Sequence, residues 1–406
     1  MKILRVVNNL YPTEIGGTGL HAHELSKAQA RLGHDVTVIT SKLDDSPAYE
    51  ERDDYHIFRI KPLVSPFGNN IMPSLLPELV KRHGDCDIIH AHSHLLFASN
   101  LCAVFRHISS APLIITNHGL VSQTAPPWVQ KLYMPTAAKL TYRAADGVIC
   151  YTDYEKSKLI DLGICANKIA VIHNGIDTGV FRGAPFSDRG KTLLWIGRYA
   201  PGKGVDYLLD AFQRFLKDHP GYTLLMIGNG PEKEAAQSKI RDLGLAEFIV
   251  MKDFIPNHEL PEVYRSACAF ILPSLNEGVP RAILEAMACG TPVICTELPQ
   301  LVDIVEGAGL LVPVRDSQAI ADALDRLVSD MDYASCLGQI GLKRVQERYD
   351  WSDTVRRTIL LYDHILGSLG AKDSPPFTPG EALTNAGAET TSSVEVGEAK
   401  GNTWDG

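Results

Sequence analysis

Short runs of β-branched residues alternate with amphipathic stretches along most of the chain, and this alternation limits the fold more than any other feature. Such a pattern is typical of βαβ units, in which helices connect parallel strands and cover the faces of the sheet. The runs form two series, from Ile3–Val7 to Lys168–Ile172 and from Thr192–Ile196 to Leu310–Val314. The sequence therefore predicts an α/β protein with two separate sheets.

The segment between the two series has the composition of a connection between domains. Asn174-Gly175-Ile176-Asp177 is followed by the glycine- and proline-containing stretch 181–190, which is typical of turns. We therefore expect an N-terminal domain over residues 1–182 and a second domain over 183–350, followed by a last helix over 351–368. From residue 371 to 406 few large apolar side chains remain, which predicts a disordered acidic tail.

Charge and cysteine content exclude several functional classes. The 406 residues hold 39 Lys and Arg against 48 Asp and Glu, a net charge of -9, so the chain lacks the basic footprint of a nucleic-acid-binding protein. The eight cysteines contain no C-x-x-C pair, and no apolar stretch resembles a signal peptide or a membrane span. We therefore expect a cytoplasmic protein with no nucleic acid partner.

Two glycine-rich turns each join a predicted strand to a helix, at Gly16–Gly19 and Gly197–Gly204. Ligands bind at such turns because glycines let the backbone approach a phosphate and the helix N-terminus offers free N–H groups. The second turn nearly matches a P-loop, but Gly204 stands where a hydroxyl would bind Mg²⁺. Arg198 and Lys203 in this turn favour a diphosphate that side chains neutralise. Flexible, solvated turns are the plainer alternative for both segments.

Two carboxylates lie in the run from Glu277 to Val293. Pro280 suits the first turn of a helix, which places Glu277 in the preceding loop and Glu285 within the helix. An ionised carboxylate accepts two hydrogen bonds, so it suits the vicinal hydroxyls of a ribose or a hexose. Stabilisation of the helix dipole is the alternative role for Glu285.

Taken in order, these motifs resemble those of the retaining glycosyltransferases of family 4, which have the GT-B fold. The resemblance covers about residues 1–368 and rests on GGTGLH (Gly16–His21), GHDVTVIT (Gly33–Thr40), TNHG (Thr116–Gly119), NGID (Asn174–Asp177), GRYAPGKG (Gly197–Gly204), GNGP (Gly228–Pro231) and the Glu277/Glu285 pair. It implies two Rossmann-like domains that face each other across a cleft, the first on the acceptor side and the second binding the nucleotide sugar. The last helix would cross back to the first domain.

The resemblance also implies roles for individual residues. Arg198 and Lys203 would hold the donor diphosphate, Glu277 the donor-sugar hydroxyls and Glu285 the ribose hydroxyls, and His118 would lie beside the donor sugar and the acceptor. The implied catalytic group is therefore His118, Arg198, Lys203 and Glu277. The other implied donor-binding positions are Gly16, Gly17, Asn174, Gly228, Asn229, Gly230, Phe254, Ile255, Gly278, Val279 and Pro280.

The activity implied by the resemblance is retaining transfer of a hexosyl unit from a UDP- or GDP-sugar to a hydroxyl of a lipid, glycan or small-molecule acceptor. Fixed cations would stabilise the negative charge that develops on the leaving diphosphate, so we expect neither a divalent metal nor another cofactor. Two positions depart from the family pattern. Glu297 lies where many members carry a glycine pair, and Asp253 stands where the family often has glycine, so the donor base stays open.

Two further segments allow other interpretations. His90, His92 and His94 on an extended segment would place three imidazoles on one side, as in a metal site, but no carboxylate completes a ligand set. Residues 128–143 put aromatic and basic side chains on one predicted helix. That helix suits either packing against the sheet or peripheral contact with an anionic membrane.

Two other activities fit part of the pattern. A nucleotide-sugar epimerase or a non-catalytic binder of the same architecture would use the donor site without any acceptor. A P-loop NTPase would use the turn Gly197–Gly204, but the missing hydroxyl at Gly204 argues against it.

Overall fold

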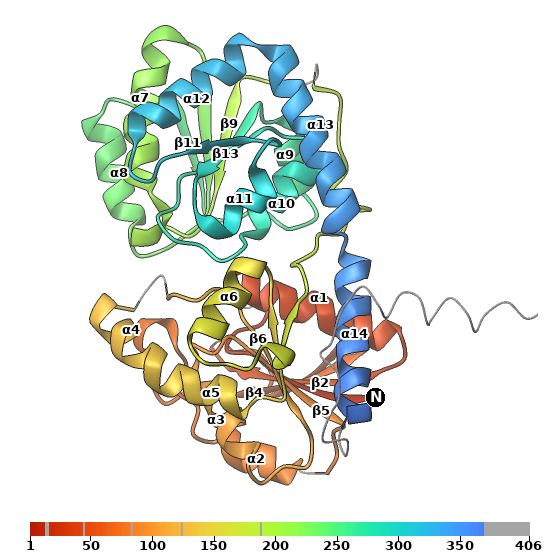
Figure 1. The fold of residues 1–406 in the computed structure, drawn as a ribbon. Coiled ribbons are helices and arrows are strands. Elements are labelled where there is room, and N and C mark those ends of the chain that lie inside the picture. Colours follow the sequence, from red (N-terminus) through yellow and green to blue (C-terminus); the bar gives the residue numbers. More distant parts are fainter. Residues whose placement is uncertain (13–15, 44, 83, 123–124, 187–188, 369–406) are drawn as a thin grey trace, which may run out of the picture.

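The computed structural model describes residues 1–368 except 13–15, 44, 83, 123–124 and 187–188, and contains two α/β domains, one above the other in Figure 1. Both domains contain a largely parallel sheet covered by helices, which confirms the predicted fold class. The predicted acidic tail, residues 371–406, lies outside the described residues.

The first domain contains an eight-stranded sheet in the order β3-β4-β2-β1-β5-β6-β7-β8. All neighbours pair in parallel except β3 and β4, which form an antiparallel pair at the edge. Strands β5, β6 and β7 are buried along their whole length, as expected of parallel strands that helices cover. The strands are β1 (Lys2–Val6), β2 (Asp35–Ser41), β3 (Tyr49–Arg52), β4 (Tyr55–Ile60), β5 (Ile88–His92), β6 (Leu113–Thr116), β7 (Gly147–Cys150) and β8 (Ile169–Val171).

The second domain contains a six-stranded parallel sheet in the order β11-β10-β9-β12-β13-β14. Its buried core includes Trp195, Phe212 and Phe270. The strands are β9 (Thr192–Ile196), β10 (Thr223–Ile227), β11 (Ile249–Lys252), β12 (Ala269–Leu272), β13 (Val293–Thr296) and β14 (Leu310–Val312). In both sheets the carboxyl ends of the parallel strands carry the loops that face the other domain.

Helices connect the strands in both domains (Figure 1). Those of the first domain are α1 (Gly17–Arg31), α2 (Leu75–Lys81), α3 (Phe97–Phe105), α4 (Pro127–Tyr133), the π-helix η2 (Met134–Ala138), α5 (Lys139–Ala144) and α6 (Asp153–Asp161). Those of the second are α7 (Val205–Asp218), α8 (Lys233–Asp242), α9 (Leu260–Ser266), α10 (Arg281–Ala288), α11 (Pro299–Val305), α12 (Ser317–Ser329) and α13 (Met331–Arg348), and α14 (Trp351–Ser368) follows. Within the described residues, no helix combines the length and hydropathy needed to cross a bilayer.

Helix α14 returns to the first domain and completes its core. Leu361, Tyr362 and Ile365 pack with buried strand residues of the first sheet. Helix α14 approaches β7 closely at Gly147, where a Cβ would lie 2.6 Å from Cδ1 of Ile365. The predicted crossing of the last helix is therefore confirmed.

Two stretches of chain pass between the domains side by side. The N–H of Ile176 donates to the carbonyl of Tyr349 at 2.7 Å, and the N–H of Trp351 donates to the carbonyl of Ile176 at 3.0 Å. Gly175 has no room for a side chain here, since a Cβ would lie 2.4 Å from Oγ1 of Thr354. The hydrogen bonds and the close packing hold the two stretches together.

Candidate active site between the domains

The turn after β9 closes with a residue that must be glycine. Pro201–Lys203 form a single 3₁₀ turn, and Gly204 then adopts φ +65° before α7 begins at Val205. A Cβ at Gly204 would lie 2.0 Å from the carbonyl oxygen of Pro273. No hydroxyl-bearing side chain can therefore stand where a P-loop places its Mg²⁺-binding Ser or Thr.

The loop after β10 packs backbone to backbone against the turn after β9. A Cβ at Gly228 would lie 1.8 Å from the carbonyl oxygen of Gly197, and one at Gly230 would lie 2.3 Å from that of Tyr199. The N–H of Tyr199 donates to the carbonyl of Asn229 at 3.0 Å. The two predicted donor motifs therefore form one compact surface, on which Asn229 and the side chain of Arg198 are exposed.

Lys203 and Glu277 meet as a salt bridge, although 74 residues separate them in the chain. The Glu277 carboxylate also accepts a hydrogen bond from Oγ of Ser274 at 2.7 Å. The side chain of Glu277 is 5% exposed and that of Lys203 is 12% exposed. This pairing of a cation with a carboxylate fixes both groups beside the turn that carries Arg198.

The loop that carries Glu277 touches the first domain. Gly278 packs against Gly119, and a Cβ at Gly278 would lie 3.1 Å both from Cα of Gly119 and from the carbonyl oxygen of His118. Asn174 joins the same contact, because its Nδ2 donates to the carbonyl of Val279 at 3.4 Å. Here the loop of the second domain, the interdomain connection and a loop of the first domain meet.

Both ring nitrogens of His118 lie within hydrogen-bond distance of residues of the first domain. Its Nε2 lies 2.9 Å from Nδ1 of His92, and its Nδ1 lies 3.0 Å from the hydroxyl of Tyr151. Burial lowers the pKa of His118 to about 3, so the imidazole is neutral at pH 7. The carbonyl of His118 faces the second domain at Gly278.

Histidines of the first domain gather around His118. The ring of His21, on α1, lies 5.3 Å from the ring of His118, and its Nδ1 lies 3.0 Å from Oδ1 of Asn174. The oxygen and the nitrogen of the Asn174 side-chain amide therefore both have protein partners, and this side chain links α1 to the loop of Val279.

The three histidines at the end of β5 do not share one side, so that expectation is wrong. Ser93 adopts φ +67° after the strand ends at His92, and this conformation turns His94 away. His90 bonds to Tyr362 and Thr116, whereas His94 bonds to Tyr142. In the described part of the chain, no group of three or more His, Cys, Asp or Glu side chains has an arrangement that could hold a metal ion.

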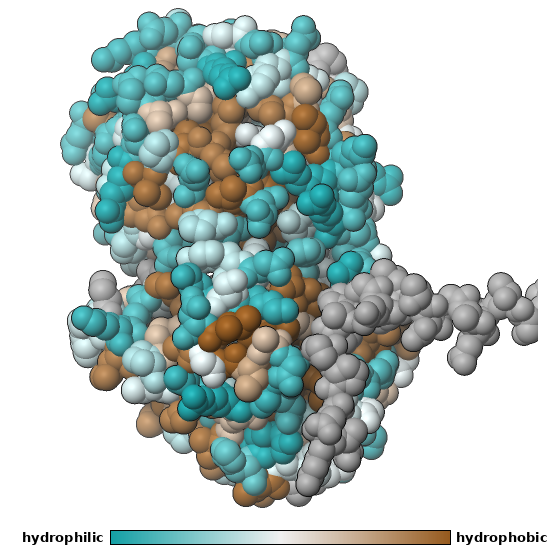
Figure 2. Space-filling model, in the orientation of Figure 1, coloured by the Kyte–Doolittle hydropathy of each residue, from teal (hydrophilic) through white to brown (hydrophobic). Residues whose placement is uncertain are grey.

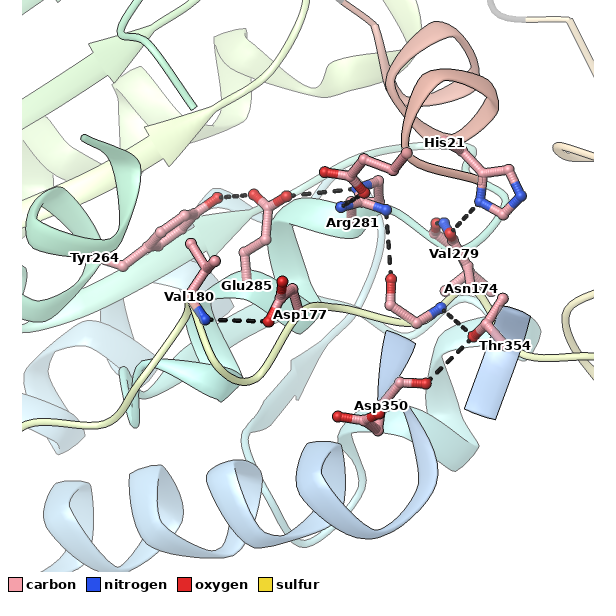
Figure 3. Close-up of polar contacts among 12 residues, drawn as sticks. His21, Asn174, Asp177, Val180, Tyr264, Val279, Arg281, Glu285, Asp350 and Thr354 are labelled. Carbon is pink, nitrogen blue, oxygen red and sulfur yellow. Dashed lines mark hydrogen bonds and ion pairs between the residues drawn. The ribbon is translucent and has the colours of Figure 1, made fainter. Parts of the chain in front are cut away.

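Glu285 is buried and paired on α10. Its Oε2 accepts a hydrogen bond from the Tyr264 hydroxyl at 2.9 Å, and its Oε1 lies 3.6 Å from Nε of Arg281 (Figure 3). Burial raises the pKa of the Glu285 carboxyl, and Arg281 offsets part of that effect. The predicted contact of Glu285 with a ribose stays a prediction, and it requires one of these two partners to move.

Arg281 is the centre of a buried polar cluster that sequence analysis did not single out. Besides Glu285, its guanidinium contacts the carboxylate of Glu24 on α1 at 2.8 Å and the carbonyl of Gly175 at 3.3 Å. Although burial alone would lower its pKa, the carboxylates of Glu24 and Glu285 raise the pKa of Arg281, so it is charged. The spacing of Arg281 and Glu285 by four residues is a signal for the pair on one helix face, whereas no local signal points to Glu24.

The remaining predicted donor positions lie at loop ends of both domains. Gly16 and Gly17 are exposed at the N-terminus of α1, where Gly16 provides no side-chain cap and the first turn contains no acid. After β11, Phe254 is exposed and Ile255 is buried. Asp253, which departs from the family pattern, forms an ion pair with Lys233. Pro280 is the N-cap residue of α10, so it directly precedes the first turn in which the sequence predicts it.

Two family models match adjacent parts of the chain. The model described as Glycosyltransferase Family 4 matches residues 15–180, and the one described as Glycosyl transferases group 1 matches residues 180–344. Together they span both domains.

Individual relatives match along nearly their whole length. The chain is 26% identical over 400 residues to an uncharacterized glycosyltransferase of Methanocaldococcus jannaschii, covering 91% of this chain and 100% of the relative. It is 29% identical over 395 residues to a D-inositol 3-phosphate glycosyltransferase of Frankia alni, covering 87% and 95%. The structure of Anabaena HepE in complex with UDP-glucose matches with a TM-score of 0.75 at 19% identity, covering 89% and 99%. The chain therefore belongs to the group 1, family 4 glycosyltransferases of the GT-B fold.

Proposed function

We propose that this glycosyltransferase moves a hexosyl unit from a UDP- or GDP-sugar to a hydroxyl acceptor, with retention of anomeric configuration and without a divalent metal. The observation that carries the proposal is the pairing of Lys203 with Glu277 beside Arg198, on a turn where Gly204 leaves no room for a metal-binding hydroxyl. The binding of UDP-glucose by Anabaena HepE, a protein of similar fold, supports a nucleotide-sugar donor.

The chemistry follows from where charge develops. Breaking the bond between the anomeric carbon and the diphosphate oxygen leaves negative charge on the diphosphate and positive charge on the sugar ring. Arg198 and Lys203 would stabilise the leaving diphosphate, and preorganised charges of this kind are usually the largest catalytic term. The N–H groups at the start of α1 would face the same negative charge from the first domain.

The acceptor oxygen would attack the anomeric carbon on the face that the diphosphate leaves. Its proton would pass to the diphosphate oxygen whose bond to carbon breaks, so that the acceptor gains the sugar and the nucleoside diphosphate leaves protonated. Glu277 would accept hydrogen bonds from donor-sugar hydroxyls while Lys203 and Ser274 hold its carboxylate in place. The carbonyl of His118, at the contact with Gly278, would border the same space.

A thermal-shift screen tests the donor site. UDP-, GDP-, ADP- and dTDP-sugars are compared with EDTA present, because a ligand that binds only the native state raises its stability. We expect a shift with one nucleotide, its loss in Arg198→Ala and its retention in Arg214→Ala, a matched variant whose arginine lies on α7 and contacts Gln318. No shift with any of these sugars, together with a shift by Mg²⁺ and ATP in a parallel sample without EDTA, would contradict the proposal and favour the NTPase alternative.

Transfer is then followed by NMR of the anomeric proton with the donor so identified and a panel of hydroxyl acceptors. Product with the anomeric configuration of the donor supports retention, and an inverted product would contradict it. Isomerisation of the donor without any acceptor would support the epimerase alternative instead.

A further inference from the structure

The outer face of the helical segment α4–η2–α5 is apolar and exposed. The side chains of Trp128, Leu132 and Leu140 are 71%, 66% and 67% exposed. Residues four apart lie on the same side of an α-helix, so Trp128 and Leu132 share a face. The π-helix between Leu132 and Leu140 holds more residues per turn than an α-helix, which brings Leu140 round toward that face.

The inner face of the same segment is anchored, so the orientation of the outer face is fixed. The hydroxyl of Tyr133 donates to the carbonyl of His94 at 2.8 Å and to Oδ1 of Asn100 at 2.7 Å. Tyr142 is fully buried, and its hydroxyl lies 2.6 Å from Nδ1 of His94. The apolar side chains on the outer face therefore cannot reach the core of their own domain by rotating the helix.

The stretch of sequence that carries this face differs in the sign of its charge from the whole chain. Between Asp87 and Asp146 the sequence contains no Asp or Glu, although the chain has a net charge of -9. The same stretch contains Arg106, Lys131, Lys139 and Arg143, and of these Lys131 and Arg143 are exposed on the helical segment. Exposed aromatic and aliphatic side chains interleaved with cations are the pattern of a helix that rests on an anionic membrane.

The face lies on the flank of the first domain, and a hydrogen bond links its helical segment to a loop of the site between the domains. Figure 1 shows α4 and α5 along the outer left of the lower domain, and Figure 2 shows brown, apolar side chains among teal ones on that flank. The Tyr142 hydroxyl also donates to Oδ1 of Asn117 at 3.1 Å, and Asn117 directly precedes His118. A surface that held this helix would therefore hold the acceptor-side loop close to it.

We infer that the segment Pro127–Ala144 docks the protein on the surface of an anionic lipid bilayer, with Trp128, Leu132 and Leu140 inserted among the lipids and Lys131 and Arg143 at the headgroups. The occupant is a lipid surface rather than an acidic protein because the apolar side chains project from an exposed helix and the flanking cations match a sheet of negative headgroups. The inference does not depend on sugar transfer, so its test is independent of the proposed function.

Vesicle co-sedimentation of the full chain tests the inference. Vesicles of phosphatidylglycerol and phosphatidylcholine are compared with vesicles of phosphatidylcholine alone, at low and high salt. We expect binding to the anionic vesicles that salt weakens, because the cations act within a Debye length of the headgroups. Absence of binding, or equal binding to both kinds of vesicle, would overturn the inference.

Matched variants locate the contact. Leu132→Ser/Leu140→Ser is expected to lower partitioning about tenfold through lost apolar insertion, and Lys131→Gln/Arg143→Gln about thirtyfold through two lost charges. Met331→Ser/Ile340→Ser and Lys343→Gln/Arg348→Gln place the same changes on exposed positions of α13 in the second domain, and they should leave partitioning unchanged. Equal losses in the α13 variants would overturn the inference.

Two further measurements distinguish docking on a lipid bilayer from docking of this face on a second copy of the chain. Quenching of tryptophan emission by brominated phospholipids should be seen in the wild type and lost in Trp128→Phe, although the chain contains 4 tryptophans. Light scattering after gel filtration should give the same mass for the wild type and Leu132→Ser/Leu140→Ser. A wild-type dimer that this variant dissociates would show that another copy covers the face, and would overturn the inference.

Discussion

Nη2 of Arg281, in the first turn of α10, lies 2.8 Å from Oε2 of Glu24 on α1, so this ion pair joins the two domains. The same guanidinium lies above the ring of Trp351, where the chain crosses back, with 5.8 Å between its Cζ and the ring centroid. Arg281 therefore connects both domains and the crossover helix, and it also neutralises Glu285.

Arg281→Ala is expected to lower the free energy of unfolding by about 3 kcal/mol, because it leaves the buried carboxylate of Glu285 without its cation. Glu24→Ala should cost less, since Arg281 keeps Glu285 as a partner and Glu24 is partly exposed. Urea denaturation followed by circular dichroism measures both variants. The same stability for Arg281→Ala and the wild type would show that the cluster contributes nothing.

Gly204→Ala is expected to lower the free energy of unfolding by at least about 2 kcal/mol more than Gly244→Ala. Both glycines have a positive φ, +65° and +70°, so both substitutions cost backbone strain of about 1–2 kcal/mol. Only at Gly204 does a Cβ collide with a carbonyl oxygen, whereas no heavy atom lies within 4 Å at Gly244. Chemical denaturation of the two variants gives the comparison, and equal losses would contradict the collision.

Lys203→Ala and Arg198→Ala should separate stability from ligand binding. Lys203 neutralises Glu277, whose side chain is 5% exposed, so its loss should lower the free energy of unfolding by about 3 kcal/mol even without ligand. Arg198 is exposed, so its loss should change stability by less than about 0.5 kcal/mol while weakening nucleotide-sugar binding. Unfolding without ligand and calorimetric titration with it measure the two effects. Similar stability losses in both variants would argue against the Lys203–Glu277 pair.

His94 is expected to make the protein less stable in mild acid. Burial lowers the pKa of His94 from 6.5 to about 3, so below pH 6.5 the unfolded chain binds a proton that the folded chain does not. Its contribution is therefore complete above pH 6.5 and is lost as the pH falls, by about 1.4 kcal/mol between pH 7.5 and 5.5.

The variant His94→Gln isolates the contribution of His94 to the pH dependence of stability. The difference in unfolding free energy between pH 7.5 and 5.5 should be smaller in the variant than in the wild type by about 1.4 kcal/mol. Glu155, whose carboxyl pKa burial raises to about 7, acts in the opposite sense but is present in both proteins and cancels. An identical pH dependence in the two proteins would show that His94 does not titrate as its burial predicts.

The sequence predicts most strands because local composition decides them. β9 is a run of mostly large apolar residues, and it begins and ends where the sequence predicts, at Thr192 and Ile196. β3 is missed because its sequence, Tyr-Glu-Glu-Arg, is polar and pairs only along the exposed edge with β4. α1 begins at Gly17, inside the stretch Gly16–Gly19 that the sequence predicts as a turn, although three of its first residues are poor helix formers.

Only part of the candidate active site could be predicted from the sequence, because many of its contacts join residues that lie far apart in the chain. Glycine turns and the Glu277/Glu285 spacing are local patterns, so they mark the loops of the second domain without any knowledge of the fold. The partners of these groups come from far along the chain: Lys203 for Glu277, Tyr264 for Glu285 and Glu24 for Arg281. No local pattern fixes such pairs, because tertiary folding alone brings them together.

Helix α14 also orders events during synthesis of the chain. Its side chains Leu361, Tyr362 and Ile365 complete a core whose strands begin at residue 2, so we expect the first domain to complete this core only after the residues up to 368 have left the ribosome. The sheet and covering helices of the second domain lie within residues 192–348 and emerge earlier as one continuous unit. Domains generally fold as units in the order of their synthesis. In this protein we therefore expect the domain that is synthesised first to complete its core last.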